Sequence, residues 1–77
     1  MFEKMKLKKE IAKSKERIDQ IEQKRSRSQA ALVDAILRHV EPDDQDVDYF
    51  NQFTSQIDEE RANLHLLMKE LDELEKK

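Results

Sequence analysis

The sequence of 77 residues has no cysteine, no glycine and no tryptophan, and it has a single proline. Without cysteine there is no disulfide and no thiolate ligand or nucleophile, which suits a reducing compartment. Without glycine there is no glycine-rich phosphate loop and no nucleophile elbow. No apolar run approaches the roughly 20 residues that a membrane span needs, and the N-terminus lacks the apolar core of a signal peptide. We therefore expect a cytoplasmic protein without a membrane span.

Charge is what the sequence has in abundance. Charged residues make up 43% of the chain and apolar residues 36%, with a formal net charge of -3. This length allows one domain, and a chain rich in Glu, Lys, Leu and Gln but without glycine favours long helices. We predict a single all-α domain over residues 1–77.

The single proline divides the chain into two helices. Pro42 disfavours a helical backbone at Glu41, which predicts a first helix over about residues 3–40 and a turn over about 41–44. A cluster of aspartates then supplies an N-cap and first-turn acids for a second helix over about 45–75. The short turn makes the fold a long antiparallel two-helix hairpin, similar to a coiled coil. The aspartates are Asp43, Asp44, Asp46 and Asp48.

Both predicted helices carry an apolar seam at heptad spacing, and each seam contains a charged residue. Aligning the seams so that Ile18 faces Leu67 places Arg25 opposite Glu60, and an Arg facing a Glu would fix the register of the hairpin. The same register predicts four flanking ion pairs: Lys8–Glu75, Glu22–Arg61, Glu10–Lys77 and Arg17–Glu70. The first seam is Leu7, Ile11, Ser14, Ile18, Ile21, Arg25, Ser28, Leu32 and Ala35, and the second contains Phe50, Phe53, Ile57, Glu60, Leu64, Leu67, Leu71 and Leu74.

The apolar surface is wider than two helices can cover. A hairpin buries one side of each helix, and each Leu or Ile left in water forgoes roughly 1.5–3 kcal/mol. We therefore expect a homodimer that forms a four-helix bundle. The residues predicted for self-association are Ile36, Val40, Phe50, Phe53, Leu66 and Met68.

Basic residues gather in the first part of the chain, which raises a second functional hypothesis. Residues 1–29 carry ten Lys and Arg against five acids. A nucleic-acid-associated regulator of the small helical-bundle type would use this basic face. Its candidate residues are Lys9, Lys13, Lys24 and Arg27. The first functional hypothesis, which follows from the predicted self-association, is a small structural or protein-interaction module with an unidentified protein partner.

Metal and catalytic chemistry find little support in the sequence. The stretch Asp44-x-Asp46-x-Asp48 opens like a calcium loop, but Tyr49 stands at the glycine position and Ser55 at the bidentate glutamate position. The two histidines have no cysteine partner. Residues 17–24 resemble the long first helix of all-α chorismate mutases, which would imply a third helix and converging Arg, Lys and Glu or Gln side chains. With two helices predicted, we expect no enzyme, no cofactor and no metal site.

Overall fold

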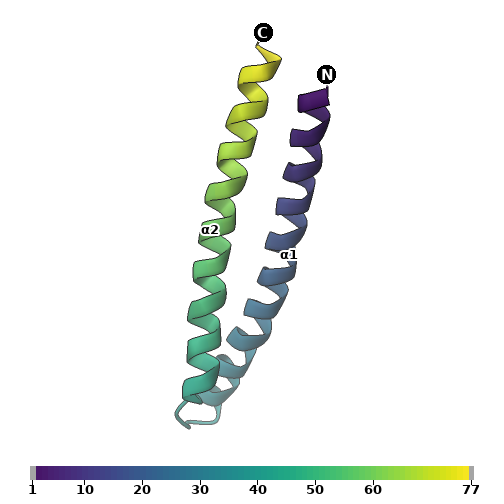
Figure 1. Ribbon diagram of the computed structural model, residues 1–77. Helices are drawn as coiled ribbons and strands as arrows, with labels where there is room; N and C mark the ends of the chain where they lie inside the picture. The colour runs from purple at the N-terminus through teal and green to yellow at the C-terminus, as the bar shows by residue number, and fades with distance from the viewer. Residues whose placement is uncertain (1, 77) are drawn as a thin grey trace.

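The computed structural model describes residues 2–76, which form two long antiparallel helices joined by a short loop (Figure 1). Helix α1 spans Phe2–Leu37 and helix α2 spans Asp44–Glu75. The molecule measures 58 × 16 × 14 Å, so it is a rod one pair of helices thick. The predicted all-α hairpin is confirmed. We call the end of the rod that holds both chain termini the open end, and the other the turn end.

Helix α1 ends at Leu37, three residues before the predicted end. His39 adopts φ 59°, the left-handed conformation that follows many helices. The N–H of His39 donates to the carbonyl of Ile36 at 3.1 Å, and the N–H of Val40 donates to the carbonyl of Ala35 at 3.0 Å. These two bonds form a Schellman motif, which occupies carbonyls that the helix end would leave unpaired. The helix is therefore stopped at His39, before the restriction imposed by Pro42 takes effect.

Helix α2 begins as predicted. Asp43 is the N-cap, and its Oδ1 accepts a hydrogen bond from the backbone N–H of Gln45 at 3.2 Å. Asp44 and Asp46 lie in the first turn, where their negative charge meets the positive end of the helix dipole. The aspartate cluster is thus explained by capping.

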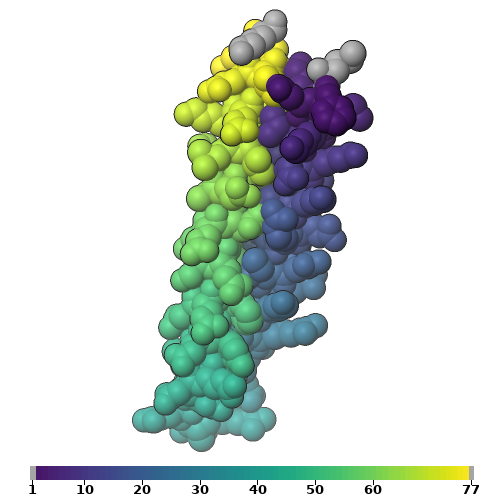
Figure 2. Space-filling model, in the orientation of Figure 1, coloured from purple at the N-terminus to yellow at the C-terminus, as the bar shows by residue number. Residues whose placement is uncertain are grey.

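The core between the helices is thin. The buried hydrophobic residues are Ile11, Ile18 and Ile57, and Ile57 has no exposed surface. Ser14 and Ser28 are also buried, and the remaining seam residues are half-buried. The helices nevertheless stay in contact along the length of the rod (Figure 2). Neither described helix is long and apolar enough to cross a membrane.

Candidate functional site

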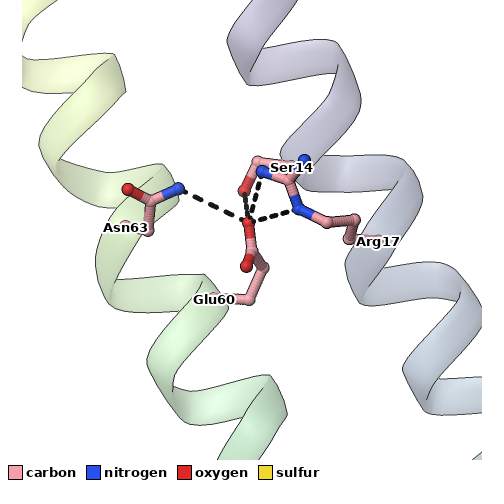
Figure 3. A network of polar contacts seen from close by, with 4 residues as sticks. All are labelled: Ser14, Arg17, Glu60 and Asn63. Atoms are coloured by element: carbon pink, nitrogen blue, oxygen red, sulfur yellow. Dashed lines mark hydrogen bonds and ion pairs between the residues drawn. The ribbon is translucent and has the colours of Figure 1, made fainter.

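Three polar side chains, from both helices, donate hydrogen bonds to one carboxylate oxygen of Glu60, near the middle of α2 (Figure 3). Ser14 Oγ donates to Glu60 Oε1 at 2.8 Å. Arg17 donates to the same oxygen through Nε at 3.0 Å and through Nη2 at 2.9 Å, and Asn63 Nδ2 donates at 3.4 Å. We call these four residues the Glu60 cluster. It is the most extensive polar link between the two helices in the described residues.

The Glu60 cluster stabilises the charged form of its carboxylate. The pKa of Glu60 is held below its usual value of 4.5, chiefly by the hydrogen bond from Arg17 and next by the one from Ser14, while burial opposes the shift. Ser14 has no exposed surface and the side chain of Glu60 is 19% exposed, whereas that of Arg17 is 45% exposed. The cation therefore keeps much of its hydration, which limits the cost of placing an ion pair between the helices.

The position of this cluster corrects the predicted register. Glu60 binds Ser14 and Arg17, so the predicted Arg25–Glu60 pair is wrong. Arg25 is half-buried and forms no hydrogen bond or ion pair with another described residue. Sliding one seam by about one heptad keeps apolar residues aligned equally well, so apolar spacing alone does not distinguish the two registers. The observed register spares Arg25 the cost of a buried ion pair, and it accompanies an α1 that ends three residues earlier than predicted.

The predicted flanking ion pairs agree with the structure only in part. Arg61 Nη2 lies 2.8 Å from Glu22 Oε1, which confirms one predicted pair. The predicted Arg17–Glu70 pair is wrong because Arg17 binds Glu60 instead. Lys8–Glu75 is not among the ion pairs of residues 2–76, and Lys77 of the predicted pair Glu10–Lys77 lies outside the described residues.

An open groove of about 600 Å³ lies between the helices at the open end. Three leucines, Leu7, Leu67 and Leu74, contribute its apolar lining. This groove was not predicted from the sequence, although leucines of the seam and glutamates beside them line it. The charged residues that line it are Glu3, Lys6, Glu10, Glu70 and Glu73.

The groove and the Glu60 cluster lie on one face of the rod. Residues seven positions apart share nearly the same side of an α-helix, because 3.6 residues make one turn. Two heptad series therefore run from the groove past the cluster toward the turn end, and we call the surface they form the groove face. On α1 the series is Glu3, Glu10, Arg17 and Lys24, and on α2 it is Glu70, Asn63, Gln56 and Tyr49. Lys6 and Glu73 line the rim of the groove. Heptad spacing places Arg27 on the same side of α1 as Lys6, and Leu66 on the same side of α2 as Glu73, so Arg27 and Leu66 lie at the margin of the groove face.

The opposite face contains the Glu22–Arg61 ion pair. Heptad spacing from this pair places apolar side chains on the same side, Ile36 on α1 and Val47 and Met68 on α2. Two lysines of α1, Lys8 and Lys15, belong to this series as well. All five of these side chains are exposed.

The structure divides the residues predicted for self-association into two groups. Ile36, Val40, Leu66 and Met68 are exposed, and Ile36 and Leu66 keep 63% and 60% of their surface in solvent. Phe50 and Phe53 are half-buried, so part of each ring already packs within the hairpin. Phe53 also stacks on Tyr49, with ring centroids 6.1 Å apart.

The four residues predicted for nucleic-acid binding are all exposed. Lys9, Lys13, Lys24 and Arg27 lie along α1, and none of them pairs with a carboxylate within residues 2–76. Their charge therefore faces solvent along the helix.

The described residues hold no group of three or more His, Asp or Glu side chains placed to bind a metal ion. His39 and His65 are exposed, one in the loop and one on α2. The ionised oxygen of Glu60 is occupied by donors from Ser14, Arg17 and Asn63, so the cluster acts as a link between helices.

Comparison with protein-family models, curated proteins and solved structures finds no match to this chain.

Proposed function

We propose that this protein is a small non-enzymatic structural or interaction module that acts through self-association of its hairpin. The observation that carries the proposal is the imbalance between buried and exposed apolar side chains. Three hydrophobic residues are buried in the described chain, while ten large ones are exposed. Each aliphatic side chain moved out of water contributes roughly 1.5–3 kcal/mol, so association of a second copy is favoured over the isolated rod.

The shape of the hairpin supports a dimer that forms a four-helix bundle. Each helix has its partner on one side only, and both faces of the rod carry exposed apolar residues, so a second hairpin on one face would cover part of them. The Glu60 cluster and the Glu22–Arg61 pair join the helices within one chain, so each copy enters the bundle as a preformed hairpin. Closed twofold pairing of identical faces is the commonest symmetry of such assemblies.

Sedimentation velocity across the micromolar range tests the proposal. We expect a dimer, and we expect the variant Leu66→Ser to dissociate at higher concentration than the wild type. Asn51→Ser and Thr54→Ser, which change polar side chains, serve as controls that leave the dimer intact. A helical wild-type monomer throughout this range would overturn the proposal. The partner protein and the cytoplasmic location stay predictions of the sequence.

A second candidate function is nucleic-acid association through the basic residues of α1. The observation that favours it is the exposure of Lys9, Lys13, Lys24 and Arg27 without carboxylate partners. Phosphate binding by these side chains would weaken steeply with added salt. We expect Lys9→Glu with Lys13→Glu to abolish RNA retention in a gel-shift assay, with Lys8→Glu as the single-site control. Retention that is independent of salt and of these substitutions would contradict this candidate.

A further inference from the structure

We propose that two copies of the hairpin pair through their groove faces in opposite orientation, so that Lys24 and Tyr49 of each copy lie on the acidic groove of the other. The proposal rests on the self-association proposed above and adds the face, the orientation and the contacting residues. Its occupant is a second copy of this chain.

The charge along the groove face changes sign between the two ends of the rod. At the open end, Glu3 and Glu10 of α1 and Glu70 and Glu73 of α2 line the groove against a single lysine, Lys6. Toward the turn end, the same face carries Lys24, with Arg27 at its margin. Opposite Lys24 the α2 series supplies Gln56, which is neutral, so no carboxylate of that series competes for the lysine. Each copy therefore presents one acidic and one basic region on a single face.

This charge distribution selects the orientation of the pair. If the two rods ran with their open ends together, the four glutamates of one groove would face the same four of the other, and like charges would repel. In the opposite orientation, a twofold axis passes near Arg17, and the two arginines that meet there are each paired with Glu60 of their own chain. Because Glu10 and Lys24 each lie seven residues from Arg17, the axis brings Lys24 of each copy to Glu10 of the other. One symmetric arrangement thus pairs opposite charges twice.

The apolar fit supports the same arrangement. Tyr49 is 43% exposed, and its ring is held by stacking on Phe53 and by a hydrogen bond from Gln45 Nε2 to its Oη at 3.1 Å. It lies near the turn end of the groove face, so the opposite orientation carries it to the open end of the second copy. There Leu74 provides an apolar lining in the open groove. An aromatic ring with a polar tip suits such a site, because its body is buried while its hydroxyl stays near the rim.

Complementary charge reversal tests the proposal. One variant carries Lys24→Glu and Arg27→Glu, and the other carries Glu10→Lys and Glu70→Lys. We expect each variant alone to dimerise at least tenfold more weakly than the wild type in sedimentation equilibrium. A 1:1 mixture should restore the affinity as a heterodimer, seen by native mass spectrometry, because both contacts between positions 24 and 10 again join opposite charges. Lys8→Glu with Lys15→Glu, on the opposite face, is the matched control and should keep the wild-type dimer. Circular dichroism checks that all variants remain helical.

The outcomes separate this proposal from the one it rests on. A monomeric wild type overturns self-association itself. A dimeric wild type whose charge-reversed variants dimerise with unchanged affinity overturns the groove-face pairing alone. As a second measurement, mixing Tyr49→Cys with Leu74→Cys under oxidising conditions should give a disulfide-linked heterodimer, since the chain has no other cysteine. A dimer that yields no such cross-link contradicts the predicted orientation.

Discussion

Replacing Glu60 by alanine should destabilise the hairpin far more than replacing its neighbour Glu59. The substitution leaves the hydroxyl of Ser14, which has no exposed surface, without its acceptor, at a cost of about 1–3 kcal/mol. The ion pair with Arg17 adds only about 0.5 kcal/mol, because the arginine side chain is largely hydrated. The expected total of about 2 kcal/mol corresponds to a fall in Tm of about 8–16 °C for a domain of this size.

The assay is urea and thermal unfolding at pH 7, followed by far-UV circular dichroism. It is run at two protein concentrations, because self-association raises the apparent stability. The control Glu59→Ala removes an exposed carboxylate that makes no ion pair in the described chain, and it should change stability by less than about 0.5 kcal/mol. Adding Ser14→Ala to Glu60→Ala should recover about 1 kcal/mol, since it removes the unpaired hydroxyl. Equal destabilisation by Glu60→Ala and Glu59→Ala would refute the reasoning.

Three further predictions concern the helix ends and pH. His39→Gly should stabilise the protein by about 1 kcal/mol in thermal melts, because glycine adopts the left-handed conformation without a steric cost. His65→Gly inside α2 should instead destabilise it by about 0.3–0.5 kcal/mol, because glycine is a weaker helix former than histidine. Asp43→Ala should cost about 1 kcal/mol in urea unfolding through loss of the N-cap, and Asp48→Ala much less. Because the folded pKa of Glu60 lies below 4.5, its contribution is present above that pH and is lost as the pH falls through the folded pKa. Urea titrations from pH 7 to 3 should therefore show that the difference in free energy of unfolding between the wild type and Glu60→Gln disappears at acidic pH. A difference that stays constant over this range would contradict the role assigned to Glu60, and a His39→Gly variant less stable than the wild type would contradict the role assigned to His39.

The sequence predicted those parts of the fold that depend on local chemistry. Pro42 and the aspartates after it located the turn, and the structure shows which of those aspartates, Asp43, is the N-cap. The end of α1 was placed three residues late because histidine seldom adopts a left-handed conformation, and the sequence offered no glycine to signal one.

The register was harder to predict because it depends on long-range contacts. A shift of one heptad preserves the apolar alignment, so the outcome was decided by polar side chains. Ser14 was recognised as a seam residue, but the ability of Arg17 to reach Glu60 from the edge of the seam was missed. Long arginine side chains also make ion pairs a weak guide to register. Arg61, for example, reaches Glu22 in the observed register and was predicted to do so in the other one.

An isotope-filtered NOE experiment on a 1:1 mixture of labelled and unlabelled protein tests the central claim most directly, namely that each chain folds back on itself with Glu60 held by α1. The observed register predicts intrachain NOEs from the γ protons of Glu60 to the β protons of Ser14 and the δ protons of Arg17. NOEs from Glu60 to Arg25, or contacts to Ser14 that appear only between labelled and unlabelled chains, would contradict it.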